Sequence, residues 1–91
     1  MATLRITKIK QKPSLILLNV EGAVGSESAW VLEEECKGWL KKKNTVQLDF
    51  SGVTSIDHEG VKMLRKMASA HLQVIHCPDF IHRLLNLKAR G

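Results

Sequence analysis

The sequence contains few of the residues that most often mark a chemical site. Its 91 residues include two tryptophans, two phenylalanines and no tyrosine, so aromatic side chains are scarce. A surface that stacks single-stranded nucleic acid needs aromatic rings between its cations, and too few rings are present to form one. No apolar run is long enough to span a bilayer. We therefore expect neither a nucleic-acid partner nor membrane insertion.

Cysteine and histidine are also sparse. Cys36 and Cys77 lie far apart, and no Cys-x-x-Cys pair is present, which argues against the common zinc and redox motifs. The histidines are too widely spaced to form a metal-ligand pattern. The first residues lack the apolar core of a signal peptide. We expect a cytoplasmic protein with two free thiols, no metal and no cofactor.

The remaining composition is that of a small globular domain. The length predicts one domain spanning residues 1–91, and hydrophobic and charged residues make up an ordinary 44% and 25%. The net charge of +5 comes from lysines grouped in residues 8–12, 37–43 and 62–66. A mildly basic surface explains this charge, and the alternative is a partner that is itself anionic.

Hydrophobic periodicity predicts alternating strands and helices. Four strands are expected over residues 4–11, 15–20, 46–50 and 72–77. Three helices are expected, beginning near Ser26 or Ser28, at Asp57, and after Pro78-Asp79. The short break at residues 12–14 predicts an antiparallel first pair, whereas the later alternation predicts parallel pairing. The expected fold is a single α/β domain in the order β-β-α-β-α-β-α, with a mixed four-stranded sheet packed with helices.

The second predicted helix has two distinct sides. Its inner side is expected to carry the residues Val61, Leu64, Met67, Ala68 and His71. Its outer side is expected to carry the residues Lys62, Arg65, Lys66 and Ser69. The basic stripe is either a solvated helix face or a surface for an acidic partner.

The start of this helix is the most informative position in the chain. Asp57 is placed to accept hydrogen bonds from backbone N–H groups that the helix cannot satisfy itself. Gly60 permits a close backbone approach or an unusual dihedral angle. A helix N-terminus also favours anions. From these residues alone, an ordinary helix cap with a turn glycine is the simpler interpretation, and a functional site is the alternative.

The segment Leu48-Asp49-Phe50-Ser51-Gly52-Val53-Thr54-Ser55-Ile56-Asp57-His58-Glu59-Gly60-Val61 resembles the signature of the STAS family, named for sulphate transporters and anti-sigma-factor antagonists. The likeness covers nearly the whole chain. The family's loop after its second strand resembles Val20-Glu21-Gly22, and its last strand and last helix resemble Val74-Ile75 and Phe80 to Leu87. The resemblance implies a non-catalytic module for bacterial signalling and transcription regulation. Such a module docks on another protein through the N-terminus of its second helix.

The chain departs from the family pattern at the regulatory position. In the antagonist branch, a Ser or Thr directly after the aspartate is phosphorylated by a partner kinase, and the phosphate releases the partner. Here that position is His58, followed by Glu59, and Gly25 replaces a common acidic loop residue. Serine phosphorylation at this position is therefore excluded. Either the domain binds constitutively, or Glu59 supplies a permanent negative charge that partly imitates the phosphate.

The resemblance thus implies a site and several classes of partner. The partner-binding residues it implies are Asp57, His58, Glu59, Gly60, Lys62, Arg65 and Lys66, supported by Asp49, Gly22 and Gly25. The partner is either an anti-sigma factor or kinase, or the ATPase subunit of a membrane transporter of the lipid-export type. A small ligand or nucleotide is a third alternative, although residues 22–25 lack the spacing and lysine of a phosphate loop. A weak dimer of the chain with itself is a further alternative.

Overall fold

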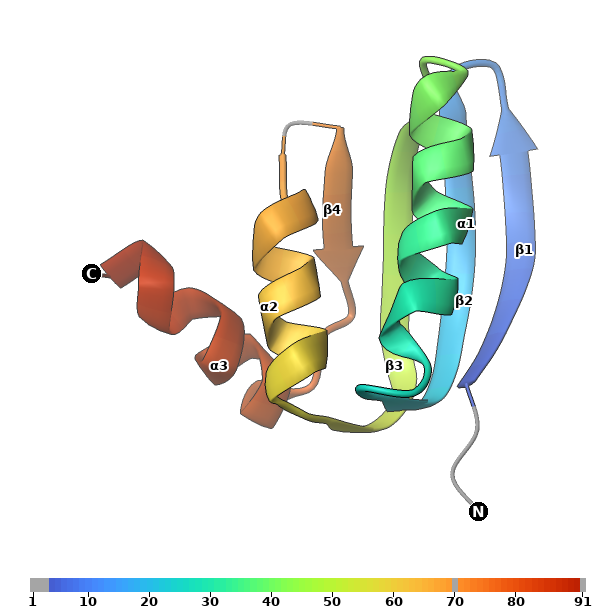
Figure 1. Ribbon diagram of the computed structural model, residues 1–91. Helices are drawn as coiled ribbons and strands as arrows, with labels where there is room; N and C mark the ends of the chain where they lie inside the picture. The colour runs from blue at the N-terminus through green and yellow to red at the C-terminus, as the bar shows by residue number, and fades with distance from the viewer. Residues whose placement is uncertain (1–3, 70, 91) are drawn as a thin grey trace.

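Alternating apolar side chains assemble four strands into one sheet (Figure 1). The computed structural model describes residues 4–69 and 71–90, with side chains described up to residue 84. The strands are β1 (Leu4–Lys12), β2 (Leu15–Val24), β3 (Thr45–Ile56) and β4 (Leu72–Ile75). The helices are α1 (Ala29–Lys41), α2 (His58–Met67) and α3 (Asp79–Arg90). The spatial order is β1-β2-β3-β4, with β1 antiparallel to β2 and the other pairs parallel. The predicted element order and mixed sheet are confirmed.

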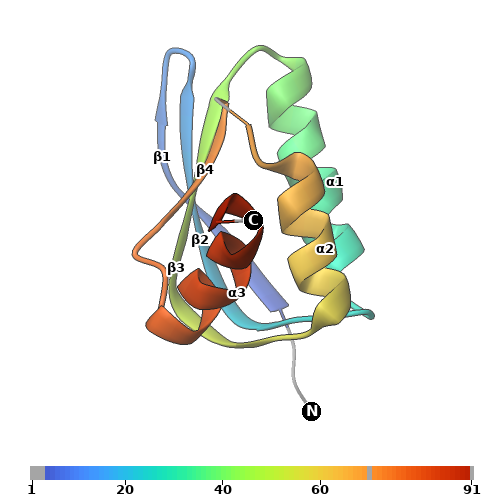
Figure 2. The same cartoon turned by 90° about the vertical axis from the view of Figure 1, so that its left-hand side faces the viewer.

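Helices α1 and α2 cover one face of this sheet (Figure 2). The core between the layers comes mainly from β2 and β3, whose inward side chains are Ile16, Leu18, Val20, Val46, Leu48 and Phe50, all fully buried. Leu32 and Cys36 of α1 and Leu64 of α2 pack onto them. Burial of a Leu, Ile or Phe side chain contributes roughly 1.5–3 kcal/mol, so this face holds the domain together.

Strands β2 and β3 run further than their side-chain patterns predicted. Residues 21–24 and 51–56 were expected to be loops, but they pair with each other, as in Glu21 with Gly52 and Val24 with Ile56. Two register shifts interrupt this pairing, and Gly22 has a φ of 96°. Such irregularities break the period-two pattern while the backbone ladder continues. Conversely, β4 ends at Ile75 rather than Cys77, because His76 adopts a left-handed φ of 51°.

The alternation predicted for β1 holds only through Lys8. A β-bulge separates Lys8, which pairs with Leu18 of the covered face, from Lys10, which pairs with Leu17 of the open face. The side chain between them, Ile9, is left 53% exposed. A bulge adds one residue to one strand and so reverses the sides that follow it.

The end of α2 differs from its predicted extent. The helix stops at Met67, and the next residue, Ala68, has a non-helical ψ of 132°. A turn follows, in which the Ser69 hydroxyl accepts a hydrogen bond from the His71 N–H at 3.1 Å. Ala68 and His71 are therefore exposed and do not belong to the inner side of the helix.

Both cysteines are free thiols, as predicted. Cys36 is buried in the core, and this burial raises its pKa to about 12. Cys77 is partly buried, and its pKa is raised for the same reason. Within residues 4–69 and 71–90, no helix is both long and apolar enough to cross a membrane.

Candidate functional site

Asp57 caps α2, as its position in the sequence predicted. Its Oδ1 accepts a hydrogen bond from the Gly60 N–H at 3.0 Å, and its backbone is extended, as is usual for a capping residue. Its Oδ2 accepts a second bond, from the Ser26 N–H at 3.0 Å, which ties the helix start to the chain before α1. Hydrogen bonds from Gly60 and Ser26 stabilise the carboxylate and hold the pKa of Asp57 below its usual value.

Two glycines make this arrangement sterically accessible. A Cβ on Gly60 would lie 2.6 Å from the Val24 carbonyl oxygen and 2.7 Å from Cγ1 of Ile56, so the helix start packs directly on the ends of β2 and β3. A Cβ on Gly25 would lie 2.8 Å from Asp57 Oδ2. The glycine that replaces the family's acidic loop residue therefore leaves room for the Asp57 carboxylate.

Ser28 plays a different part from the one predicted for it. It precedes α1, but its side chain makes no capping bond to the helix. Its hydroxyl accepts a bond from the Gly25 N–H at 3.1 Å and donates one to the Ala23 carbonyl oxygen at 2.9 Å. Ser28 thus fixes the turn that brings Ser26 to Asp57.

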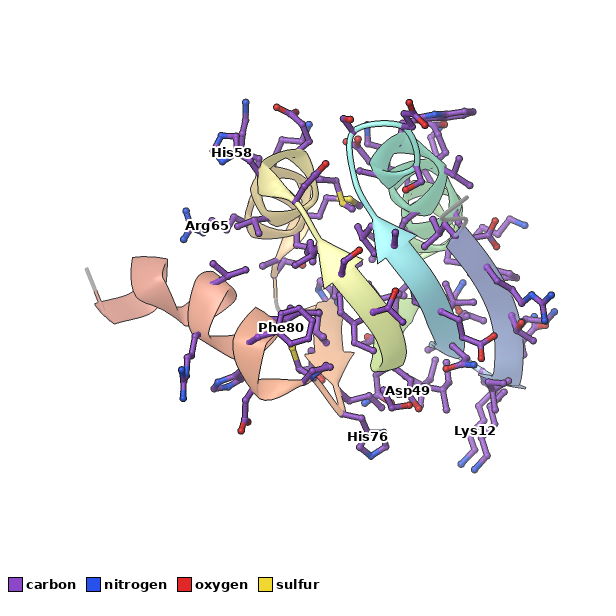
Figure 3. All side chains as sticks on the ribbon, turned by 90° about the horizontal axis from the view of Figure 1, so that it is seen from below. Lys12, Asp49, His58, Arg65, His76 and Phe80 are labelled. Atoms are coloured by element: carbon purple, nitrogen blue, oxygen red, sulfur yellow. The ribbon has the colours of Figure 1, made fainter. Side chains whose placement is uncertain are left out.

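His58 and Glu59 are both exposed in the first turn of α2. His58 extends away from the sheet (Figure 3). Asp57 already occupies the Gly60 N–H, so the helix start is closed by its own cap. His58 and Glu59 are therefore exposed beside the cap rather than part of it.

The three cations of the predicted stripe separate into different roles. Lys66 Nζ lies 3.1 Å from Glu33 Oε2 and links α2 to α1, whereas Arg65 donates to the Leu84 carbonyl oxygen at 2.9 Å and links α2 to α3. Glu33 is also paired with Lys37 at 3.3 Å, and hydrogen bonds from Lys66 and Lys37 lower its pKa. Lys62 is exposed beside them. Two of the three predicted binding cations therefore hold helices together.

A groove of about 300 Å³ runs between the starts of α1 and α2. We call it the α1–α2 groove, and its lining residues are Ser26, Ala29, Trp30, Glu33, Glu59, Lys62, Met63 and Lys66. Trp30 is 61% exposed there, an unusual state for so large an apolar side chain. Trp30 was not predicted as a site residue. The apolar stripe of α1 consists of Ala29, Leu32 and Cys36, and the position of Trp30 outside this stripe was the signal of its exposure.

The supporting residues do not all lie at this site. Asp49 and His76 lie on the sheet face that points away from α1 and α2 (Figure 3), with Asp49 Oδ2 3.2 Å from His76 Nδ1. Burial disfavours the charged form of Asp49, but bonds from Ser51 and His76 outweigh it and lower its pKa. Gly22 lies inside β2, paired with Leu4 and Val53. Asp49 and Gly22 therefore have local structural roles.

The described part of the chain contains no cluster of three or more histidine, cysteine or acidic side chains placed to bind a metal ion. All buried side-chain nitrogen and oxygen atoms described there have hydrogen-bond partners. The α1–α2 groove is open to solvent rather than an enclosed cavity.

Comparisons with known proteins agree with this architecture. A family model described as "Mlab, STAS domain" matches residues 7–88. The fold is similar to that of an anti-sigma factor antagonist from Mycobacterium paratuberculosis, with a TM-score of 0.72 and 16% identity over 99% of this chain and 80% of that one. It is also similar to the anti-sigma factor antagonist SpoIIAA in its unphosphorylated form, with a TM-score of 0.69 and 11% identity over 98% and 83%. No curated protein matches the chain.

Proposed function

The chain belongs to the STAS-domain family, and from this premise we propose that it is a non-catalytic regulatory module that docks on a protein partner. The docking surface is the first turn of α2, with His58 and Glu59, together with the α1–α2 groove. Family membership supports a protein-interaction role, and the exposure of Trp30 supports this particular surface.

The exposed Trp30 is the observation that carries the proposal. Tryptophan is enriched among the residues that dominate binding energy at protein interfaces, where it fills a pocket on the partner. Trp30 is 61% exposed and borders a groove whose rim also carries Glu59 and Lys62. A large apolar anchor beside charges of both signs supplies affinity from the ring and orientation from the charges.

The partner interaction works without the family's serine switch. His58 has no hydroxyl group, so a serine/threonine kinase acting on this position has no hydroxyl to phosphorylate. Glu59 adds a fixed negative charge in the same helical turn, where negative charge is favourable. Under this proposal, binding is regulated by the supply of partner rather than by phosphorylation at the start of α2.

The missing hydroxyl also favours a second candidate for the partner's identity. An anti-sigma factor that is also a serine kinase needs a hydroxyl acceptor at this position to be released, whereas the ATPase subunit of a membrane transporter does not. Stand-alone domains similar to this one regulate transporters of the lipid-export type. We therefore keep a transporter ATPase subunit beside an anti-sigma factor as the partner, with the same docking surface in both cases.

Affinity capture from the native host tests the proposal. Tagged wild-type chain should retain a partner, and Trp30→Ala should lose it, while the control Gln11→Ala, an exposed residue of β1, should retain it. Mass spectrometry of the retained protein then separates a sigma-factor regulator from a transporter ATPase. Retention of the same partner by Trp30→Ala at wild-type yield would contradict this docking surface.

Two substitutions examine the switch positions. His58→Ser, assayed with the cognate kinase, restores a hydroxyl where the family has one; if partner binding stays insensitive to the kinase, the loss of the hydroxyl was not what removed regulation. Glu59→Ser removes the fixed charge and should change the partner affinity. An unchanged affinity would show that Glu59 does not imitate a phosphate.

A further inference from the structure

Six lysines gather at the end of the molecule opposite the start of α2. Three lie on β1, at positions 8, 10 and 12, and three follow one another at the end of α1, at positions 41, 42 and 43. The end of β1 and the end of α1 lie together at the top of Figure 1, and α2 begins at the bottom. The Thr45 N–H donates to the Ser14 carbonyl oxygen at 2.8 Å and joins the two turns. We call the six lysines the basic end.

Trp39 connects the two groups of lysines. The Lys8 and Lys42 ammonium groups each lie 5.3 Å from the centre of its ring, at cation–π distance. Its Nε1 donates to Glu35 at 3.0 Å. Residues 4–20 and 36–48 contain no aspartate or glutamate, so Glu35 is the nearest acid with a described contact to this cluster. The positive charge of the basic end is therefore largely uncompensated by its own chain segments.

An exposed apolar side chain lies between two of these lysines in β1. The β-bulge in β1 leaves Ile9 53% exposed, directly between Lys8 and Lys10. Lysines and a bulge on an edge strand are explained by protection against edge-to-edge aggregation. An exposed isoleucine works against that protection, so aggregation control alone does not account for the arrangement. Cations flanking an exposed apolar residue match the requirements of a bilayer interface.

We propose that the basic end binds the surface of membranes rich in anionic lipids, with Ile9 entering the boundary between headgroups and acyl chains. Anionic headgroups attract juxtaposed lysines without a fixed geometry. Nucleic acid is less well matched, because its recognition favours arginine and free aromatic faces. All six cations here are lysines, and the Trp39 ring already contacts two of them. Docked in this way, the chain directs the start of α2 away from the membrane.

Co-sedimentation with vesicles tests the proposal. The full chain should bind vesicles of phosphatidylcholine mixed with phosphatidylglycerol, should not bind phosphatidylcholine alone, and should dissociate at high salt. Each lysine near an anionic surface contributes about fivefold to partitioning, so Lys10→Gln/Lys12→Gln should weaken binding about 25-fold. Ile9→Ser should weaken binding about fivefold, by removing the apolar contact.

Matched controls separate the contribution of this surface to vesicle binding from the effects of net charge and of misfolding. Lys62→Gln/Lys66→Gln removes the same charge elsewhere and should leave vesicle binding within about twofold of wild type, because those residues line the α1–α2 groove rather than the basic end. Lys10→Arg/Lys12→Arg keeps the charge and should bind as wild type. Equal losses in the two glutamine variants, absence of binding to phosphatidylglycerol vesicles, or binding to duplex DNA in their place would overturn the proposal.

Discussion

The two ends of the molecule are built on different principles. At the start of α2, close contacts specify the structure: Asp57 accepts two backbone hydrogen bonds, and Gly25 and Gly60 leave no room for a Cβ. At the basic end, charge predominates, with exposed lysines on β1 and after α1. The start of α2 combines a closely packed backbone with a few exposed side chains. The basic end combines a β-hairpin with many exposed lysines.

This difference predicts how each end responds to change. Contacts at van der Waals distance are lost abruptly, so single substitutions at the start of α2 should have large and position-specific effects. Exposed like charges act additively and are screened by salt, so substitutions at the basic end should have small and interchangeable effects. A specific partner is therefore expected at the first end and a chemically uniform one at the second.

The largest effect is expected from Gly60→Ala. The new Cβ would lie 2.6 Å from the Val24 carbonyl oxygen, a backbone atom that cannot yield cheaply. Overpacking of this kind costs about 3 kcal/mol in the free energy of unfolding. Urea denaturation followed by circular dichroism measures it.

Gly38→Ala is the matched control for that substitution. Gly38 lies within α1, and a Cβ there would meet nothing within 4 Å. Alanine should therefore stabilise the helix by roughly 0.5–1 kcal/mol. If the two alanine variants had equal stability, close packing at the start of α2 would not be what distinguishes it.

Trp30→Ala should separate binding from folding. The side chain is 61% exposed, so the free energy of unfolding should change by less than about 0.5 kcal/mol. Loss of a tryptophan anchor typically costs about 2 kcal/mol of binding, or roughly 30-fold in partner affinity. Calorimetric titration with the captured partner measures the second quantity, and a destabilised variant with unchanged affinity would reverse the assignment.

Asp57→Asn should make the free energy of unfolding less dependent on pH. Because the hydrogen bonds from Gly60 and Ser26 lower its pKa in the folded chain, the carboxylate stabilises the fold above its unfolded pKa of about 4. That contribution is lost as the pH falls through the folded pKa. The difference in free energy of unfolding between wild type and Asp57→Asn, measured by urea denaturation, should be largest near neutral pH and should shrink in acid. A difference that does not vary with pH would mean that the charge of Asp57 has no stabilising role.

The smallest effect is expected from Lys66→Ala. The pair with Glu33 spans α1 and α2 at 3.1 Å, but the Lys66 side chain is 68% exposed. Exposed ion pairs contribute roughly 0.2–1 kcal/mol, so the free energy of unfolding should fall by no more than that and less at high salt. A loss above about 2 kcal/mol would place this pair among the close-packed contacts of the α2 start.

The sequence was sufficient for features with local causes. The order of elements follows from hydrophobic period, and the cap at Asp57 follows from its position at the predicted helix start, so both predictions are confirmed. Features that depend on distant segments were missed. The bond from Ser26 to Asp57 spans 31 residues. Nothing local to either residue indicates this contact.

The misplaced and missed site residues have different explanations. Arg65 shares a stripe with Lys62, and only the position of α3 reveals that it donates a hydrogen bond to the Leu84 carbonyl oxygen. Trp30 was overlooked because a tryptophan in a helix is normally a core residue, although its place outside the apolar stripe of the helix indicated exposure. The exposure of Ile9 reflects the bulge in β1, and the spacing of three between Ile6 and Ile9, which breaks the alternation, was the overlooked signal.

Site-directed photo-crosslinking in the native host tests the docking surface most directly. A photoreactive amino acid placed at His58 probes the start of α2, and the same amino acid at Gln11 probes the opposite end; both positions are exposed. The account predicts that His58 crosslinks to one defined protein, that Trp30→Ala abolishes this product, and that Gln11 does not crosslink to that protein. A product that forms from Gln11 and not from His58 would contradict docking through the start of α2.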